Sequence, residues 1–488
     1  MARFDELPPE ILNIICEFFS LNDLMKLTAV NRKLYTVATS PKLWQHFQFV
    51  QTDPTKLKFL ITLERLSQVK SFIIKRSMNR TMWSQLGPKL SLPVLGGVVE
   101  KFEEIDLSGV DLSKKQVVFL FEKVCNSRQK VLKKLRIFSK FDFVAAETFG
   151  KSLCMLEQVD LGYHRIKESH QENLFLNMTR SSNIKSLLIH DNISQGIPSF
   201  LVANALKNLE ELSMFGMSKA QTNAFFEELV KSCSLKAMSM DNKNLKHVPA
   251  HVLTKVVLML ESVDLFDHLS EVQTAHLFEE LASDKSVSKL KNLRLVGYVS
   301  SMVKVKPSIF ASALSNIEEV DISYSNLLQP YKNSLFSTIK GSRVKKLNMM
   351  SVNLSSVPAV TLGRAILGLE EVELSYTNLN SEQVNIIFEL MGGKDNRKKL
   401  KMLNLVGNNL RSISPYALAE GFNSVETTNL SDTRIERDQV EALLEVMVQN
   451  TRLKRIKMDF SDVCQYEDSL VADARRKGVV FIIEEADE

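Results

Sequence analysis

The chain has 488 residues, of which 62 are basic and 57 acidic, so its formal net charge is only +5. A charge this small does not by itself indicate nucleic acid as a partner. The five cysteines show no CxxC spacing, and no apolar run reaches the length of a signal or a membrane span. We therefore expect reduced thiols, a cytoplasmic or nuclear location, no membrane insertion, and neither a metal nor another cofactor.

Residues 1–49 are predicted to form a small helical module. Pro8 and Pro9 suit the first turn of a helix, and an apolar face at helical spacing follows them. That face consists of Ile11, Ile14, Ile15 and Phe18. Two more short helices are expected, over 24–30 and around Leu34 and Val37. So small a unit buries little core, which predicts apolar surface left for a partner. Residues 50–68 read as a helical connector without a flexible linker composition.

From residue 69 to 463 one pattern recurs, with apolar residues at its first, fourth and sixth positions. Its clearest copy is Leu400-x-x-Leu403-x-Leu405-x-x-Asn408-x-Leu410. The first position is placed at Val69, Phe102, Leu132, Leu156, Ile184, Leu209, Leu235, Leu260, Leu290, Ile317, Val344, Leu369, Leu400, Val425 and Leu453. These are about fifteen repeats, and the thirteen steps from Phe102 to Leu453 average 27 residues.

Each repeat is expected to hold a short strand and a helix that cannot bury their own apolar sides, so the copies must stack. The predicted fold is an α/β solenoid, a curved horseshoe with parallel inner strands and outer helices. Outer segments alternate between a helix such as 221–229 and a proline entry, as at Pro198, Pro249 and Pro358. The true unit is thus a pair of repeats, about 54 residues long.

The second position of the repeats alternates in charge. It reads Glu103, Lys133, Glu157, Lys185, Glu210, Lys236, Glu261, Lys291, Glu318, Lys345, Glu370, Lys401, Glu426 and Lys454. Because neighbouring strands lie about 4.8 Å apart, this order places a Glu beside a Lys at every step. We call this row the charge ladder and predict that it fixes register.

Residues 464–488 are expected to cap the array, with a last strand over 479–483 and a solvated acidic tail.

The inner face carries the candidate binding residues. At the fifth position, acids favour one repeat type, and bases or amides favour the other. Tyr324 and Tyr376 each follow such an acid, Asp321 and Glu373, by three residues. Aromatic and acidic side chains two repeats apart predict a patch that binds a Lys- or Arg-containing segment of a protein target. The competing location is the C-terminal loops near Asp432 and Phe460.

Two resemblances extend this interpretation. The repeat length and two-repeat alternation resemble the ribonuclease-inhibitor-like class of leucine-rich repeats. Near the N-terminus, Leu7-Pro8-x-Glu10-Ile11-Leu12, Leu21-x-Asp23-Leu24, Leu27 and Val30-Asn31-Arg32 resemble an F-box. Asn31 and Tyr35 depart from that pattern. The resemblance implies docking on a Skp adaptor, and through it on a cullin ubiquitin ligase. The implied adaptor-facing or supporting residues are Leu7, Pro8, Ile11, Leu12, Leu24, Leu27 and Val30. The alternative is that these residues are the core of the small module.

Three other motifs favour ordinary structural roles. Gly150-Lys151-Ser152 lacks the upstream glycine of a phosphate loop. His247 and His251 flank Pro249 without further metal ligands, so surface histidines are expected. The basic run over 394–401 reads as a solvated rim in preference to a phosphate site.

No residue set combines a nucleophile, a base and an oxyanion donor, so we expect no enzyme. The predicted function is that of the substrate-recognition subunit of a Skp/cullin/F-box ubiquitin ligase that holds a protein target on its inner face. The alternative is a stand-alone inhibitor or scaffold of the ribonuclease-inhibitor kind. A small-GTPase activator is a third, weaker possibility, which the N-terminal box disfavours.

Overall fold

The computed structural model describes residues 7–16, 26–27, 30–38, 48–49, 71–73, 91–459 and 480–484. Gaps inside the long stretch cover residues 109, 128–130, 163–164, 266–267, 284–287, 298–301, 394–399, 423 and 450–451. The chain divides into two compact units, unit 1 from Met1 to Leu235 and unit 2 from Lys236 to Glu488.

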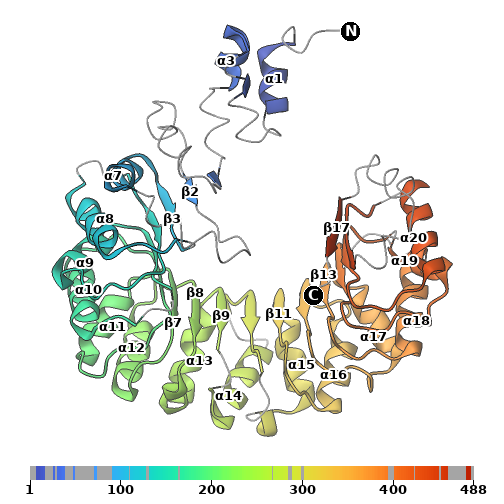
Figure 1. The fold of residues 1–488 in the computed structure, drawn as a ribbon. Helices are drawn as coiled ribbons and strands as arrows, with labels where there is room; N and C mark the ends of the chain where they lie inside the picture. Colours follow the sequence, from blue (N-terminus) through green and yellow to red (C-terminus); the bar gives the residue numbers. More distant parts are fainter. Residues whose placement is uncertain are drawn as a thin grey trace. The chain divides into compact units, whose positions relative to one another are not determined.

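In its described residues, unit 1 holds two N-terminal helices and the first part of the repeat array (Figure 1). Its helices are α1 (Pro9–Cys16), α3 (Arg32–Ala38), α7 (Leu92–Lys101), α8 (Lys114–Asn126), α9 (Ala146–Cys154), α10 (Glu168–Arg180), α11 (Ser199–Leu206) and α12 (Lys219–Lys231). Its strands are β1 (Gln48–Phe49), β2 (Ser71–Ile73), β3 (Glu104–Asp106), β4 (Lys134–Arg136), β5 (Gln158–Asp160), β6 (Ser186–Ile189) and β7 (Glu211–Met214). These strands pair in parallel and in chain order.

Unit 2 continues the same alternation. Its helices are α13 (Ala250–Met259), α14 (Glu271–Ala282), α15 (Pro307–Ser315), α16 (Gln329–Ile339), α17 (Ala359–Ile366), α18 (Ser381–Gly392), α19 (Pro415–Phe422) and α20 (Arg437–Gln449), with 3-10 helices η4 (Lys243–His247) and η5 (Met302–Lys304). Its strands are β8 (Ala237–Met240), β9 (Ser262–Asp264), β10 (Asn292–Arg294), β11 (Glu319–Asp321), β12 (Lys346–Asn348), β13 (Glu371–Glu373), β14 (Met402–Asn404), β15 (Thr427–Asn429), β16 (Arg455–Asp459) and β17 (Val480–Glu484). Strands β8 to β17 also pair in parallel and in chain order.

The fifteen predicted repeats supply the fifteen strands β2 to β16, each of which begins two residues after a predicted first position. In the β13 repeat, Leu369, Val372 and Leu374 are fully buried beneath the helices. Residues between them face away from the helices because side chains alternate along a strand. The α/β solenoid is therefore confirmed, with strands on the inner face of each unit and helices on the outer face (Figure 1).

The alternation of the outer segments is one of helix length. Helices α8, α10, α12, α14, α16, α18 and α20, which follow Glu-type strands, have 11–13 residues. Helices that follow Lys-type strands have 8–10 residues. The proline entries do not replace a helix, because Pro198, Pro249 and Pro358 each stand immediately before one.

A buried glutamine joins a Glu-type repeat to the Lys-type repeat that precedes it. The Gln383 side-chain amide donates to the carbonyls of Leu354 and Val357 in the preceding repeat, both at 2.7 Å. Its Oε1 accepts from the Asn380 backbone N–H at 2.9 Å and so completes a capping box. The same bridge is made by Gln221, Gln273 and Gln439. In α16 the hydroxyl of Tyr331 takes this role, at 2.9 and 2.7 Å from the carbonyls of Met302 and Val305.

The final strand also forms. Strand β17 pairs with β16 and begins one residue later than the expected strand over 479–483. The connector over 50–68 lies outside the described residues, so the boundaries of the modules stay predictions.

Candidate protein-binding surfaces

The N-terminal helices bury one set of apolar side chains and expose another. Leu12, Cys16, Leu34 and Val37 are buried where α1 packs against α3. Ile11 and Val30 remain 43% and 62% exposed. A module with this little core and these exposed aliphatic groups can gain apolar contacts by docking.

The implied adaptor residues divide between those two sets. Pro8, Ile11 and Val30 are exposed, Leu7 and Leu27 are half-buried, and Leu12 belongs to the core. Leu24 lies outside the described residues. Leu12 can therefore support the surface but not form it.

The fifth position of the repeats carries an ionic bridge in each unit. In unit 2 the Arg294 guanidinium lies 3.3 Å from Asp264 Oδ2 and 3.2 Å from Asp321 Oδ2. In unit 1 Arg136 stands in the same way between Asp106, at 3.7 Å, and Asp160, at 2.9 Å. Each arginine thus compensates two carboxylates on neighbouring strands.

The third position repeats this arrangement in unit 2. Lys346 Nζ lies 3.2 Å from Glu319 and 3.5 Å from Glu371, on the strands either side of it. Sequence reasoning passed over this position, although its acid–base–acid order is visible when the repeats are aligned.

A hollow of about 540 Å³ opens over these two rows on the inner face of unit 2. Its charged lining residues are Asp264, Arg294, Glu319, Asp321, Lys346, Glu371 and Glu373. Five carboxylates against two cations make the lining anionic, with a formal charge of −3. The structure thus brings the predicted target residues Asp321 and Glu373 to one hollow.

The two predicted carboxylates differ in how they are compensated. Asp321 is paired with Arg294. Glu373 accepts hydrogen bonds from the Ser375 N–H at 2.8 Å, the Ser375 hydroxyl and the Asn404 amide. These donors are neutral, and among the described residues no cationic group lies within ion-pair distance of Glu373. Of the five lining carboxylates, Glu373 is thus the one without an ion-pair partner among the described residues, which favours it as the contact for an incoming cation.

The predicted tyrosines stand beside the hollow and are absent from its lining. Tyr324 and Tyr376 are 56% and 49% exposed, and both have a left-handed backbone, with φ of 58° and 56°. The Tyr376 ring covers Gly407, where an added Cβ would lie 2.2 Å from the ring. Tyr324 reaches across to the next repeat, with its hydroxyl 3.4 Å from the sulfur of Met350. Phe460, in the competing location, lies outside the described residues.

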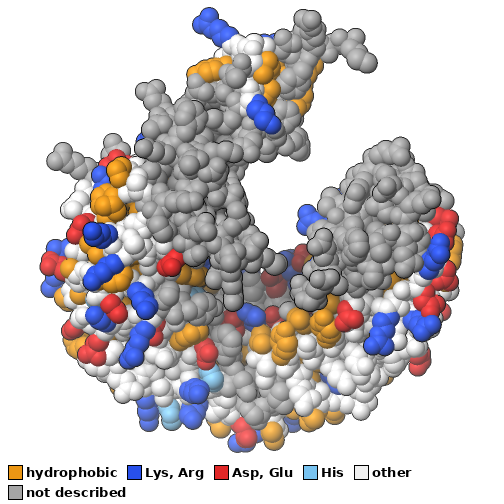
Figure 2. All heavy atoms as spheres, in the orientation of Figure 1, with side chains coloured by type: hydrophobic (Ala, Val, Ile, Leu, Met, Phe, Trp, Pro, Cys, Tyr) orange, Lys and Arg blue, Asp and Glu red, His pale blue; other side chains and the backbone are white. Residues whose placement is uncertain are grey.

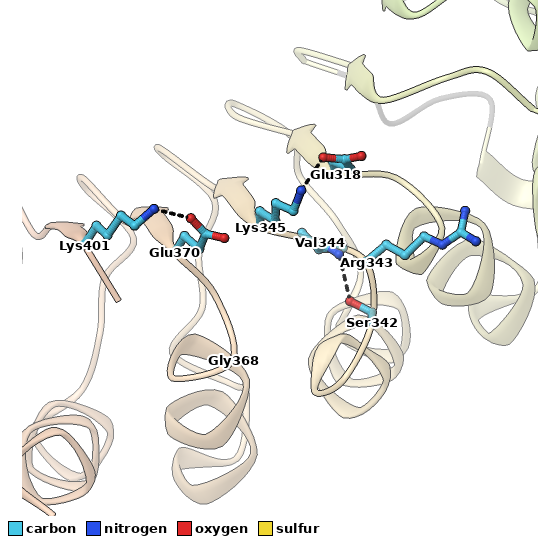
Figure 3. A pocket seen from close by; sticks show the side chains of 8 residues that line it. All are labelled: Glu318, Ser342, Arg343, Val344, Lys345, Gly368, Glu370 and Lys401. Carbon is cyan, nitrogen blue, oxygen red and sulfur yellow. Dashed lines mark hydrogen bonds and ion pairs between the residues drawn. The ribbon is translucent and has the colours of Figure 1, made fainter. Parts of the chain in front are cut away.

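The charge ladder runs along the edge where the strands begin. Lys345 Nζ lies 2.6 Å from Glu318, and Lys401 Nζ lies 2.6 Å from Glu370 (Figure 3). The other pairs of this kind are Glu103–Lys133, Glu157–Lys185, Glu261–Lys291 and Glu426–Lys454. Each of these lysines meets the Glu of the preceding repeat, so the ladder consists of discrete pairs, and a glutamine bridge such as that of Gln383 joins one such pair to the next. A hydrogen bond from its Lys lowers the pKa of Glu318, and the same bond raises the pKa of Lys345.

The remaining motifs have structural explanations. Gly150-Lys151-Ser152 lies inside α9, where Lys151 pairs with Glu147 at 2.6 Å and the Ser152 hydroxyl donates to the Phe149 carbonyl. His247 ends η4, and His251 lies in the first turn of α13. Most of the basic run, 394–399, lies outside the described residues. Burial raises the pKa of the Cys154 thiol to about 11, which makes it a poor nucleophile at neutral pH.

Neither a candidate metal site nor a candidate membrane span is found among the described residues. They contain no group of three His, Cys, Asp or Glu side chains that could hold a metal ion. None of their helices combines the length and the apolar character needed to cross a membrane.

Comparisons with known proteins identify the N-terminal module. A family model described as F-box-like matches residues 4–49, so the chain begins with an F-box-like domain. A search of curated proteins gives no sequence match. A similar solved structure is described as "Crystal structure of Rad7 and Elc1 complex in yeast". The TM-score is 0.38 at 13% identity, over 97% of this chain and 92% of that chain. A likeness this low carries no functional argument.

Proposed function

We propose that this protein is a non-catalytic receptor of a cullin ubiquitin ligase. In this proposal the F-box-like domain docks on a Skp adaptor, and the array, of the leucine-rich-repeat kind, holds a protein target. The observation that carries the proposal is the family match over residues 4–49, on a module whose Ile11 and Val30 side chains stay exposed. The proposal places the protein in the cytoplasm or nucleus, compartments in which free thiols persist.

The target-binding residues proposed are Asp321, Tyr324, Glu373 and Tyr376. Their support is the anionic hollow on the inner face and the two exposed tyrosines beside it. Aromatic side chains next to charged groups are typical anchors of protein interfaces.

The test uses the full-length chain and a purified Skp adaptor. Replacing Leu7 and Pro8 by Ala removes apolar area from the proposed docking surface and should abolish adaptor capture. The melting of the array should not change, because the module has a core of its own. Replacing Tyr324 and Tyr376 by Ala serves as the control that keeps adaptor binding.

Capture that is undiminished in the Leu7 and Pro8 variant would refute adaptor docking through this surface. A wild-type chain that binds no adaptor would instead favour the stand-alone inhibitor or scaffold, which needs the array alone.

A further inference from the structure

Among the described residues of the repeat array, exposed large apolar side chains are more numerous in unit 2. Within the described part of the array, unit 1 exposes Leu92 and Phe200. Unit 2 exposes seven such residues, namely Val272, Val303, Tyr324, Leu328, Val360, Tyr376 and Tyr416. Figure 2 shows hydrophobic side chains gathered on the visible face, in the region where Figure 1 places β11.

All seven residues lie between the end of a strand and the first turn of the next helix. Tyr324 and Leu328 lie between β11 and α16, Tyr376 lies between β13 and α18, and Tyr416 is the second residue of α19. The carboxyl ends of parallel strands share one edge of a sheet. These side chains therefore belong to one edge of unit 2, which we call the apolar edge.

Two residues of the apolar edge, Tyr324 and Tyr376, have a left-handed backbone conformation that is unfavourable for residues with a bulky side chain. The turn after the strand makes the eighth position left-handed in successive repeats of unit 2, at Ser351 and Asp432 as well as at Gly297 and Gly407, where glycine adopts it without strain. Tyr324 and Tyr376 adopt it with a bulky side chain, at a cost of about 1–3 kcal/mol each. The turn imposes this conformation on whichever residue stands there, so the sign of binding is the choice of two half-exposed aromatic rings for such positions.

The apolar edge adjoins the anionic hollow. Asp321 and Glu373 line the hollow, and the two tyrosines follow them after three residues, a reach of about 10 Å at most. The backbone N–H groups of Ser323 and Ser375 donate to the side-chain carboxylates of Asp321 and Glu373 and so fix the intervening turns. One bound chain can therefore contact the edge and the hollow together.

We propose that the apolar edge and the hollow of unit 2 bind one extended protein segment in which apolar side chains alternate with Arg or Lys. The apolar side chains cover Tyr324, Leu328 and Tyr376, and a basic side chain reaches Glu373. The anionic lining selects for this charge and against acidic segments. This inference depends on the proposed function at one point, because it takes the bound segment to be part of the target protein.

The direct test uses three synthetic peptides of equal length and the full-length protein. One peptide alternates Leu with Arg, the second alternates Leu with Glu, and the third alternates Ser with Arg. Fluorescence anisotropy should show the Leu/Arg peptide binding at least about tenfold more tightly than the other two, and binding should weaken with salt.

Matched variants locate the contact. Replacing Tyr324 and Tyr376 by Ala should weaken Leu/Arg binding about thirtyfold, whereas Phe200→Ala, on the equivalent edge of unit 1, should leave it unchanged. Glu373→Gln should weaken binding about tenfold. Glu371→Gln should change it less, because Lys346 already pairs with Glu371.

Equal binding of the three peptides would overturn the proposal. So would full binding by the double tyrosine variant combined with loss in Phe460→Ala, which would move the site to the C-terminal loops. Adaptor binding measured on the same samples separates the two proposals, because either interaction can fail while the other persists.

Discussion

The repeat arrays of units 1 and 2 share their construction and differ in what they leave exposed. Both pair their strands in parallel, both join repeats through buried glutamines such as Gln221 and Gln383, and both place an arginine between two aspartates. Unit 2 adds the apolar edge and the carboxylate of Glu373, which lacks a cationic partner among the described residues. The comparison separates residues that build the solenoid from residues that folding does not explain.

The largest loss of stability is expected from breaking the glutamine bridges, which the two units share. Replacing Gln383 by Ala removes both amide hydrogen bonds. The Leu354 carbonyl still accepts from the Val357 backbone N–H at 2.9 Å, whereas the Val357 carbonyl loses its side-chain donor. We expect a loss of about 1–3 kcal/mol in the stability of the surrounding repeats. Gln221→Ala should cost unit 1 a similar amount. Hydrogen exchange of the backbone amides near each site measures the local loss. A large loss in one unit and none in the other would show that the glutamine bridges do not contribute equally to the stability of the two units.

A smaller effect, a pH dependence of stability, is expected from the Asp264–Arg294–Asp321 bridge of unit 2. In unit 2, burial raises the pKa of Asp264 despite the nearby Arg294, and Asp264 Oδ1 has no hydrogen-bond partner among the described residues. The folded state therefore holds this proton more tightly than the unfolded state does. Stability should fall as pH rises from the ordinary value of 3.8 through the raised pKa.

The Asp264→Asn variant tests this expectation, because it should lose that part of the pH dependence while Arg294 keeps Asp321 as a partner. Unfolding by denaturant across acidic pH provides the measurement. Identical pH profiles for the variant and the wild type would contradict the assignment to Asp264.

The smallest effect concerns the charge ladder, whose side chains are exposed. Lys345→Glu should lower the melting temperature slightly at low salt, because Glu318 and Glu370 then flank a third carboxylate. Exchanging the pair, with Glu318→Lys and Lys345→Glu together, should restore most of the loss, because Lys345 bonds to Glu318 and interacts with Glu370 only at longer range.

The pair should also respond to acid. Because its pKa is lowered, Glu318 contributes above the ordinary value of 4.5, and this contribution is lost as pH falls through the lowered pKa. Unchanged melting for the single and the exchanged variants at low salt would mean that the alternation does not fix register.

Strand positions were predictable because burial alone sets them. A residue such as Leu403 must face the helices, so the apolar spacing determines where each strand begins. Three of the buried glutamines, Gln221, Gln273 and Gln383, follow a Ser or Asn by three residues, a capping signal that is visible in the sequence. Their hydrogen bonds to the preceding repeat join residues more than twenty positions apart, which the local pattern does not show.

The candidate site was predictable only in part. The repeat alignment placed Asp321 and Glu373 on the same face, and in the structure both line one hollow, which the sequence did not predict. Which of them keeps a free charge depends on the reach of Arg294 and on the amide of Asn404. The left-handed backbone of Tyr324 and Tyr376 likewise follows from the turn after each strand, which apolar periodicity does not describe.

The glutamine bridges also constrain how such a chain can change its length during evolution. Loss of a single repeat would set two repeats of the same type side by side. Gln383 would then lack the carbonyls of Leu354 and Val357, and two lysines or two glutamates of the ladder would become neighbours. Loss or duplication of two consecutive repeats would preserve both arrangements. Viable lengths should therefore differ by an even number of repeats.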